Sequence, residues 1–342
     1  MMPTPAKTHG CTWNRITAGD LPEIASLIEA EEYLGDATHH HDLRALSVAL
    51  ADDPQGTGDN GIVLRKPSGT LIAYAWNQVP AADDPSGPVY LHGGCHPAWR
   101  HEGVQPTLLD WQSERAIEWY LETDGAGGPL QLTMVTSATN KIFADLLPTR
   151  GFPPQKWYHA LRRPLAHPLR HTVAGVDLVP FGAAWSEPVR HLYNQILTHP
   201  SDTLDEASWQ WGLGAAGIRE DLSFVAVADG AAVGWVLNSL LDLAGERSGW
   251  TEYLGATLEW RNRGIYRALL ARSDDSFRAL GLGTAGIGVE TDSDQGARPY
   301  LEMGYQLVDT MVWYVNHPSL DRIGAAQPNQ VPAAQSEHAD GA

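Results

Sequence analysis

The chain has 342 residues, of which 43% are hydrophobic and 19% are charged, a composition typical of a soluble globular protein with room for two domains. The formal net charge of −18 argues against nucleic acid or an anionic membrane as the main partner. No apolar run approaches the length of a membrane span, residues 1–10 lack the apolar core of a secretory signal, and the two cysteines, Cys11 and Cys95, form neither a disulfide framework nor a zinc motif. We therefore expect a cytoplasmic protein without a metal site.

The first half of the chain alternates strand-like and helix-like segments. Asp20 is a typical N-cap residue, and the apolar residues that follow it recur at helical spacing, which predicts a helix there. Two apolar runs, 61–66 and 71–79, flank the turn residues 67–69 and predict a hairpin. The other segments of this half are predicted as strands at 12–16, 89–95, 130–136 and 156–162, and as helices at 43–50, 104–122 and 140–150.

The second half repeats this order of segments. Residues 164–175 are rich in proline, histidine and arginine and predict a linker between the halves. Residues 318–342 have no apolar periodicity and predict a disordered tail. The segments of the second half are predicted as strands at 176–181, 223–228, 232–241, 250–256, 285–290 and 306–315, and as helices at 185–197, 204–213, 265–280 and 296–303.

Two short motifs strengthen the case for an internal repeat. Residues 97–109 read PAWRHEGVQPTLL and residues 258–270 read LEWRNRGIYRALL, and each run follows a predicted strand and opens a predicted helix. Each half also ends its last helix in a Gly-aromatic pair, at 151–152 and again at 304–305. A repeat of this length indicates a duplicated domain.

The segment order β-α-α-β-β-β-α-β-α-β, the R-x-x-G-x loop and the terminal Gly-aromatic pair together resemble the GNAT acyltransferase superfamily. Their double occurrence is similar to its tandem group, of which mycothiol synthase is the best-known enzyme. The resemblance covers nearly all of residues 12–316 and is stronger in the second half. It implies an α/β (α+β) fold with two tandem domains, each a mixed, mostly antiparallel central sheet flanked by helices. The domains are expected at 11–163 and 176–317, joined by the linker 164–175 and followed by the tail 318–342.

The R-x-x-G-x loop implies a site for the pyrophosphate of coenzyme A, because a helix N-terminus offers unpaired N–H groups and a partial positive charge. In the second half, Arg261, Arg263 and Arg267 favour phosphate. Tyr266 stands where the family usually has Gly or Ala, so its ring either crowds the phosphates or points away. The resemblance implies backbone contacts from Leu254, Gly255 and Ala256 to the thioester and pantetheine arm. The remaining implied coenzyme A residues of this half are Arg261, Asn262, Arg263, Gly264, Ile265, Tyr266 and Ser293.

The first half carries an altered version of the same loop. Glu102 adds negative charge beside the implied phosphates, whereas Asn140 matches the family's asparagine before the last helix. The resemblance therefore implies that the first half can still bind acetyl-CoA in a structural role. Its implied coenzyme A residues are Cys95, Arg100, His101, Gly103, Val104, Gln105 and Asn140.

Acyl transfer from a thioester to an amine requires a base for the amine, a polarised carbonyl and a proton for the departing sulfur. By resemblance, the residue four positions before the terminal glycine lies near the sulfur, and it is Tyr300 in the second half but Leu147 in the first. Glu252 is the only carboxylate in the apolar strand 250–256, where the family commonly places its base, and Glu290 on the next strand is an alternative. Because leucine cannot donate a proton, this asymmetry predicts catalysis in the second half, by Tyr300 as acid and Glu252 as base.

Other chemistry-bearing residues have more ordinary interpretations. Trp209 and Trp211 either line an acceptor pocket or pack in the core. The run 39–41 of three histidines is interpreted as a surface run, because adjacent histidines point in different directions. Cys95 has no His or Asp arrangement to activate it and is interpreted as a small buried thiol.

The leading hypothesis is an acyl-CoA-dependent N-acyltransferase that uses acetyl-CoA or another acyl-CoA. It acts on a small-molecule amine by direct transfer in a ternary complex, with catalysis in the C-terminal domain and a degenerate N-terminal domain. Mycothiol synthase-like activity and modification of a specialised metabolite, such as an antibiotic, are both compatible with it. Two other hypotheses stay open: a non-catalytic acyl-CoA-binding sensor, and transfer to a protein or carrier-bound acceptor.

Overall fold

The computed structural model describes residues 10–33, 46–48, 50, 57–80, 87–100, 102–123, 128–196, 203–243, 246–293 and 295–319. These residues form two compact units. Unit 1 contains the described residues up to position 31, those from 46 to 134, and those from 315 onward. Unit 2 contains residues 32–33 and the described residues from 135 to 314.

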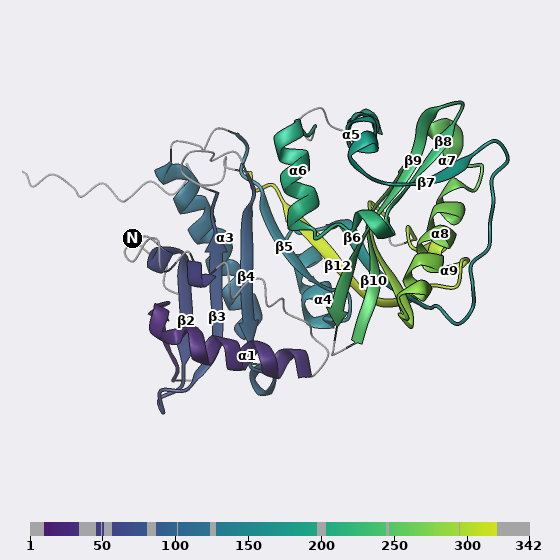
Figure 1. The fold of residues 1–342 in the computed structure, drawn as a ribbon. Coiled ribbons are helices and arrows are strands. Elements are labelled where there is room, and N and C mark those ends of the chain that lie inside the picture. Colours follow the sequence, from purple (N-terminus) through teal and green to yellow (C-terminus); the bar gives the residue numbers. More distant parts are fainter. Residues whose placement is uncertain are drawn as a thin grey trace, which may run out of the picture. The chain divides into compact units, whose positions relative to one another are not determined.

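Unit 1 is a sheet with one long helix on each face (Figure 1). The helix α1 (Leu21–Tyr33) buries Ile24 and Ile28 against one face, and α3 (Val104–Glu122) buries Leu108 against the other. Four strands pair antiparallel in chain order, and the start of a fifth pairs in parallel with the fourth. The strands are β1 (Thr12–Arg15), β2 (Gly61–Arg65), β3 (Leu71–Gln78), β4 (Val89–Cys95) and β5 (Leu132–Ser137), with short 3-10 turns at Ala18–Asp20, Thr57–Asn60 and Pro97–Trp99.

The start of α1 differs in detail from the sequence prediction. Thr17, and not Asp20, is the cap of the short 3-10 turn that leads into α1. The Asp20 carboxylate accepts hydrogen bonds of 2.7 Å from both the backbone N–H and the hydroxyl of Thr17. It also pairs with Arg65 of β2, so its charge ties the helix entry to the sheet.

Unit 2 is built around a larger sheet with the strand order β12-β6-β11-β10-β9-β8-β7, and residues 135–137 of β5 flank β12. Strands β10 and β11 pair in parallel, whereas β10 with β9, β11 with β6, β12 with β6, β7 with β8 and β8 with β9 pair antiparallel. The strands are β6 (Pro154–Pro164), β7 (Asp177–Pro180), β8 (Phe224–Ala228), β9 (Ala231–Leu243), β10 (Glu246–Ala256), β11 (Thr284–Thr291) and β12 (Gln306–Asn316). The helices are α4 (Lys141–Thr149), α5 (Ala183–Ile196), α6 (Glu206–Ala215), α7 (Leu258–Arg261), α8 (Ile265–Ala279) and α9 (Arg298–Leu301), with a 3-10 turn at Glu220–Leu222.

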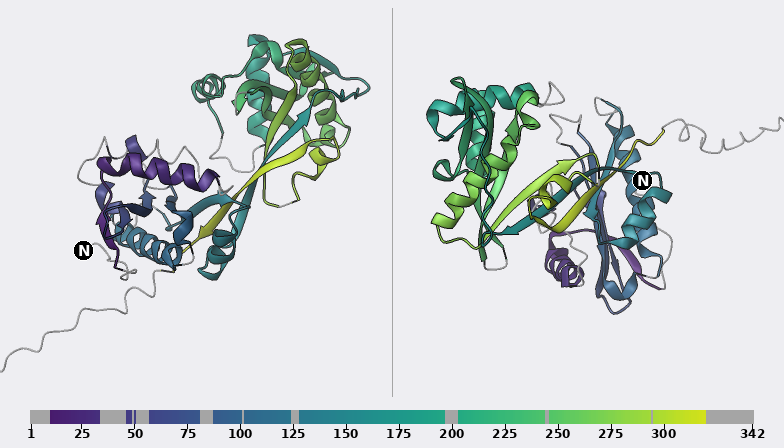
Figure 2. Two further views of the ribbon diagram at one scale, coloured as in Figure 1. Left: turned by 90° about the horizontal axis from the view of Figure 1, so that it is seen from below. Right: turned by 90° about the vertical axis from the view of Figure 1, so that its right-hand side faces the viewer.

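Two cores hold the helices of unit 2 on opposite faces of its sheet (Figures 1 and 2). On one face, α8 packs through Ile265 and Leu269 onto β8 and β9. On the other face, α5 and α6 pack onto β8 and β9 around Trp209, Trp235 and Leu237. Alternating residues of β9 therefore face different helices, as expected for a strand buried on both sides.

Strand β6 was expected to close the first half of the chain, but it lies in unit 2 between β11 and β12. Its last residues are held there by a buried ion pair between Arg163 and Asp274 of α8. Arg163 also donates a hydrogen bond of 2.6 Å to the carbonyl of His167. In the expected linker, Leu165 and Leu169 are buried and pack against the cores of unit 2.

The fold class is confirmed, because both halves show the predicted element order around mixed sheets flanked by helices. The predicted helix at 43–50 is described only at 46–48 and 50, which are helical. The histidine run 39–41 and almost all of the predicted tail 318–342 lie outside the described residues.

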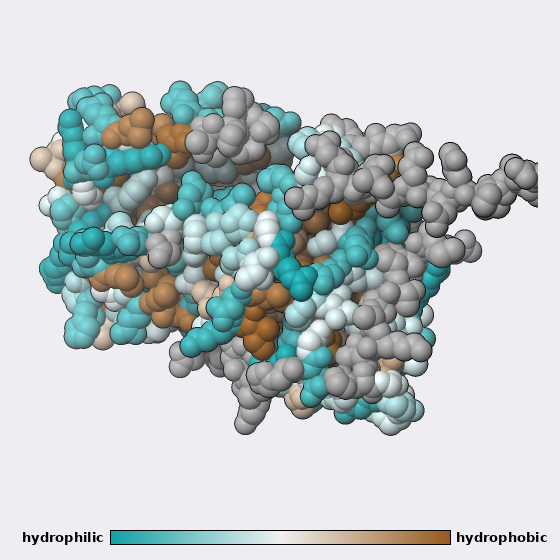
Figure 3. Space-filling view, turned by 180° about the vertical axis from the view of Figure 1, so that it is seen from behind, coloured by the Kyte–Doolittle hydropathy of each residue, from teal (hydrophilic) through white to brown (hydrophobic). Residues whose placement is uncertain are grey.

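Polar residues interrupt the apolar ones across the face of the molecule shown in Figure 3. Among the described residues, no helix combines the length and the apolar character that a bilayer span requires. The described residues also contain no cluster of His, Cys, Asp and Glu arranged to hold a metal ion.

Candidate active site

Strand β10 carries a β-bulge at the residue expected to act as base. The pairing of β10 with β9 shifts register between Thr251 and Tyr253, which leaves Glu252 as the extra residue. Side chains of a regular strand alternate between the two faces, and a bulge breaks that alternation. Glu252 and Tyr253 can therefore share a face of the sheet although they are consecutive.

Contacts show that both side chains lie on the face covered by α5 and α6. Leu237 of β9 packs with α5 and α6, and Ser239, two residues further along β9, shares its face. The hydroxyl of Ser239 donates a hydrogen bond of 2.6 Å to Glu252. The ring of Tyr253 meets that of Tyr193 in α5 edge-on, with 6.1 Å between centroids.

Burial sets the protonation behaviour of Glu252. It raises the pKa of the carboxyl above its ordinary value, and the hydrogen bond from Ser239 partly opposes the rise. The negative charge of Glu252 in turn helps burial to raise the pKa of Tyr158 and Tyr253. Glu290, the alternative base, is 57% exposed and pairs with Lys156 over 2.8 Å. Of the two carboxylates, Glu252 is therefore the one that is half-buried and has a raised pKa.

Next to Glu252, strands β10 and β11 separate. Their parallel pairing runs from Gly249↔Ala285 to Thr251↔Ile287, although both strands continue beyond these residues. On β11, Gly288 has no side chain, and the phenol of Tyr158 from β6 lies over it. The separation leaves backbone groups of β10 after the bulge, from Leu254 to Ala256, without a partner strand on that side in the pairs described.

The loop after β10 prepares the N-terminus of α8. Gly264 is the N-cap with φ 81°, in the left-handed region that favours glycine, and no side chain caps the helix there. The first-turn N–H groups are therefore available to an anion. Arg261 donates from Nε to the carbonyl of Ala256 over 3.0 Å, which anchors the loop to β10. His171 lies so close to Gly264 that a Cβ added there would meet its imidazole.

The other loop residues have distinct surroundings. Arg263 is 52% exposed, pairs with Glu259 over 3.3 Å and stacks on the ring of Trp260. The ring of Tyr266 is partly buried and packs against the core under α8. The remaining expected contacts are Asn262, which is exposed, Ile265, which is fully buried, and Ser293, which is exposed and forms a turn.

Tyr300 lies in α9 and packs against the core beneath α8. Its ring meets that of Tyr305 edge-on, with 6.2 Å between centroids. Burial raises the pKa of Tyr300 to about 12, with a smaller contribution from Tyr266. The phenol therefore keeps its proton at neutral pH and is available as a hydrogen-bond donor.

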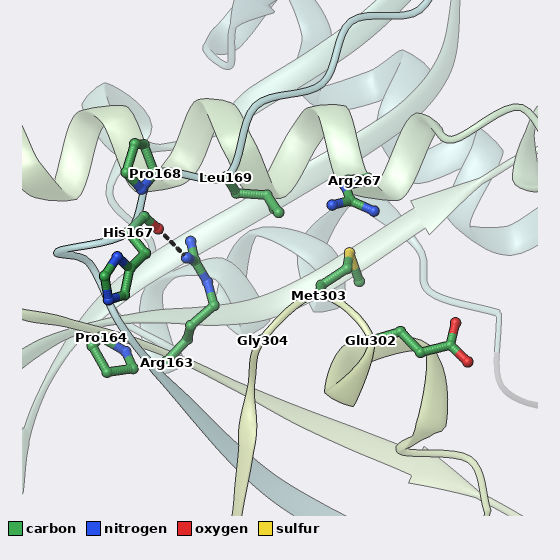
Figure 4. A pocket seen from close by; sticks show the side chains of 9 residues that line it. All are labelled: Arg163, Pro164, His167, Pro168, Leu169, Arg267, Glu302, Met303 and Gly304. Carbon is green, nitrogen blue, oxygen red and sulfur yellow. Dashed lines mark hydrogen bonds between the residues drawn. The ribbon is translucent and has the colours of Figure 1, made fainter.

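A pocket of about 340 Å³ opens between α8, the segment after β6 and the turn after α9 (Figure 4). Arg267 extends from α8 at one wall, and Met303 and Gly304 form another. Arg267 is exposed and has no ion-pair or hydrogen-bond partner in the part of the chain that is described. It is one turn from Gly264, so its charge adds to the positive end of the helix.

A second pocket, of about 620 Å³, lies between α5, α6 and β10. Tyr193, Trp211 and Tyr253 contribute rings to its wall. Trp209, the other tryptophan expected near an acceptor, is buried behind it in the core. The sequence left pocket and core as alternatives for this pair, and the structure divides them: Trp211 lines the pocket and Trp209 packs inside.

In unit 1, a carboxylate from α1 lies at the end of β4, the strand that corresponds in the repeat to β10. Glu31 is 4% exposed and accepts a hydrogen bond of 3.0 Å from the backbone N–H of Cys95. It also lies 4.0 Å from Arg100, the arginine of the altered loop, and crowds Gly94. Burial, helped by Glu31, raises the pKa of the Cys95 thiol to about 12, so Cys95 is a buried thiol and not a nucleophile.

The other coenzyme A residues expected in the first half cap helices or are buried in the structure. Gly103 is the N-cap of α3 with φ 72°, like Gly264 in the second half. Val104 and Gln105 are buried, and the amide oxygen of Asn140 caps α4 by accepting from the N–H of Phe143. Leu147 is fully buried, and His101 lies outside the described residues.

The sequence of residues 186–305 matches the Acetyltransferase (GNAT) family. These residues form a GNAT acetyltransferase domain. The GNAT domain contains the bulge of β10, the loop before α8 and Tyr300, but not Tyr158 or His171. No curated protein matches the chain significantly.

Solved structures share the fold of about nine-tenths of the chain, which extends beyond the GNAT domain. A GCN5-related N-acetyltransferase from Sphaerobacter thermophilus has a TM-score of 0.69 at 20% identity, covering 92% of this chain and 99% of its own. A tandem GNAT protein from the clavulanic acid biosynthesis pathway has a TM-score of 0.56 at 14% identity, covering 90% and 99%. A fungal GCN5-related glucosamine N-acetyltransferase region, within a multi-domain β-N-acetylglucosaminidase, has a TM-score of 0.61 at 14% identity, covering 90% of this chain and 38% of its own.

Sequence reasoning missed several residues around the GNAT domain's site. The site also includes Ser239 of β9, Tyr158 of β6, and His171 of the segment between the halves. Glu31 was missed in unit 1 because nothing in an amphipathic helix marks which carboxylate turns inward. The bulge had one sequence signal, a lone carboxylate in an apolar strand.

Proposed function

We propose that the protein is an acyl-CoA N-acetyltransferase that acts on a small-molecule amine at the site of the second half. One observation carries the proposal: the bulge of β10 places a half-buried carboxylate with a raised pKa beside the point where β10 and β11 separate. The family match at residues 186–305 supports the same reaction class. A cytoplasmic location and the division into functional domains at 11–163 and 176–317 are part of this proposal.

The residues present fit acetyl-CoA, which supplies the acyl group as a thioester when it is bound. The uncapped N-terminus of α8, with Arg267 one turn away, suits its phosphates. The backbone of Leu254, Gly255 and Ala256, next to the strand separation, suits the thioester and its arm. Tyr266, which stands where the family usually has a small residue, packs against the core under α8, and we propose that its ring leaves the loop open to the phosphates.

The chemistry follows from the protonation states of two side chains. The neutral amine nitrogen of the acceptor bonds to the acyl carbon as the carbon–sulfur bond breaks, and Glu252 takes the proton that this nitrogen loses. Tyr300, which is protonated at neutral pH, gives a proton to the sulfur, which leaves as a free thiol. The products are an amide and coenzyme A. Positioning of the two substrates supplies much of the rate.

The first half is proposed as a degenerate copy. Glu31 occupies the N–H of Cys95, which corresponds in the repeat to Ala256, and it faces the arginine of the loop. A carboxylate at this place competes with a thioester carbonyl for the N–H and repels phosphate. We infer that acyl transfer takes place in the second half alone. Because a tandem GNAT protein of similar fold comes from the clavulanic acid biosynthesis pathway, specialised metabolites belong among the acceptors to assay.

Replacing Tyr300 by phenylalanine tests the assigned acid. Removal of the phenol should lower kcat by about 100-fold, the usual contribution of general acid catalysis, while the Kd for acetyl-CoA stays within a factor of about three. Tyr305→Phe is the matched control, because it removes a neighbouring phenol from the same core and should leave kcat near that of the wild type. Equal kcat for Tyr300→Phe and the wild type would remove Tyr300 from the mechanism, and binding without transfer to any amine would favour a sensor.

A further inference from the structure

The pocket between α5, α6 and β10 is formed mainly by apolar and aromatic side chains. Tyr193 of α5 and Tyr253 of β10 form its floor, and they belong to a cluster of rings that includes Trp209 and Trp235 behind the wall. The ring of Tyr193 meets that of Tyr253 edge-on and lies tilted against those of Trp209 and Trp235, arrangements that aromatic rings favour. A volume of about 620 Å³ is ample for a small molecule.

Trp211 is the unusual residue of this pocket. Its side chain is 77% exposed, the most exposed among the large hydrophobic side chains that the structure describes. It makes no ring contact with the described residues and stands at the pocket wall on α6. An exposed indole beside an apolar pocket gains most by stacking on a flat apolar surface or by contact with a cation.

The pocket offers little to a polar ligand. None of the residues that line it carries a charge. Apart from the two tyrosines, the polar residue that lines the pocket is Ser208. The N–H and the hydroxyl of Ser208 both donate to Asp205, the N-cap of α6. Asn194 holds both backbone groups of Leu204, at 2.9 and 3.0 Å, and so fixes that part of the wall without facing outward. A ligand with many hydroxyl or ammonium groups would leave them without partners there, which is costly.

The pocket and the proposed base are adjacent in the sequence. Tyr253 lines it, and Glu252 is the preceding residue on the same face of the sheet. We propose that the acceptor is a primary amine on a short chain attached to an aromatic body, an arylalkylamine. This inference rests on the proposed function. The aromatic body stacks on Trp211 and Tyr253, and the neutral amine reaches the carboxylate of Glu252, which takes the proton that the nitrogen loses on acylation.

Two amines of different class test the proposal with acetyl-CoA as donor. The full-length protein should release free thiol from acetyl-CoA with phenethylamine at a kcat/KM at least about tenfold above that with glucosamine, because an unpaired polar group costs more than one factor of ten. Spermidine, a polycation without a flat surface, should behave like glucosamine. A higher kcat/KM with glucosamine or spermidine would overturn the aromatic acceptor while leaving the transferase in place.

Substitution of Trp211 locates the binding site. Trp211→Ala should raise the KM for phenethylamine by about tenfold, the loss expected for one stacked ring, with little change in the KM for acetyl-CoA. Trp211→Phe should recover most of the affinity, and Leu280→Ala, which removes an exposed apolar side chain at the end of α8, should have no effect. An unchanged KM in Trp211→Ala would overturn the proposal.

Ligand-observed NMR with phenethylamine separates this inference from the proposed function. Binding that is lost in Trp211→Ala but kept in Leu280→Ala supports the pocket even when no transfer takes place, and in that case the transferase proposal falls alone. Absence of phenethylamine binding to the wild type overturns the pocket. Transfer to other amines would then still support the transferase.

Discussion

At the scale of single residues, the site depends on how burial acts on two ordinary side chains. Burial raises the pKa of Glu252 toward the range of a useful base and raises that of Tyr300 to about 12, so one group readily accepts a proton and the other holds one. Both residues were proposed from the sequence, Glu252 as the only carboxylate in an apolar strand and Tyr300 from its position in the motif that resembles the family. The hydrogen bond from Ser239 to Glu252 was not predictable, because Ser239 pairs with Trp250 near the bulge only in the register that β9 adopts against β10.

The pH dependence of kcat/KM tests the role of Ser239. Glu252 must be ionised to act as base, so activity should fall on the acid side with a pKa above the ordinary glutamate value. The hydrogen bond from Ser239 stabilises the ionised form, so Ser239→Ala should raise this pKa further and move the acid limb to higher pH. Activity well above that pKa should change little. Ser248→Ala, which removes a buried hydroxyl paired with Thr284 and not with Glu252, should leave the limb in place. A limb that stays or moves to lower pH in Ser239→Ala would contradict the assignment of Glu252.

At the scale of elements, the sequence predicted the strands and helices well but not all of their partners. Period-two and helical patterns indicate which segments form strands and helices, and the repeat supplied their order. The placement of β6 escaped prediction, because alternation along a strand does not say which neighbours it pairs with. In the structure β6 pairs with β11 and β12, brings Tyr158 over Gly288, and ends in the ion pair of Arg163 with Asp274.

Two adjacent aspartates on α8 test how firmly β6 is held. Asp274 is 1% exposed and its partner Arg163 is 4% exposed, so Asp274→Ala leaves a buried charge unpaired. The free energy of unfolding should fall by about 3–5 kcal/mol. Asp275 is 58% exposed and pairs with Arg278, so Asp275→Ala should lower it by less than about 1 kcal/mol. Urea denaturation followed by circular dichroism gives both values. Similar losses for the two variants would show that the buried pair does not anchor β6.

At the scale of the whole molecule, the two halves repeat one order of elements but differ in the side chains at their strand ends and loops. Both halves place a left-handed glycine at the start of a long helix, Gly103 before α3 and Gly264 before α8. Only the second half joins that loop to a bulged carboxylate and a buried phenol; the first presents Glu31 and Leu147 instead. The sequence predicted this asymmetry at Tyr300 and Leu147, but the inward carboxylate of Glu31 required the structure.

The same glycine substitution in both loops tests whether acyl transfer takes place in the second half, as proposed. Gly264→Ala and Gly103→Ala place a Cβ at nearly the same backbone angle, so each costs about 1–2 kcal/mol of local strain. The measurement is kcat/KM for acetyl-CoA in amine-dependent thiol release. We predict a loss of about tenfold or more in Gly264→Ala, where the Cβ also meets His171 beside the anion site, and near wild-type activity in Gly103→Ala. Loss of activity in Gly103→Ala with full activity in Gly264→Ala would contradict the account.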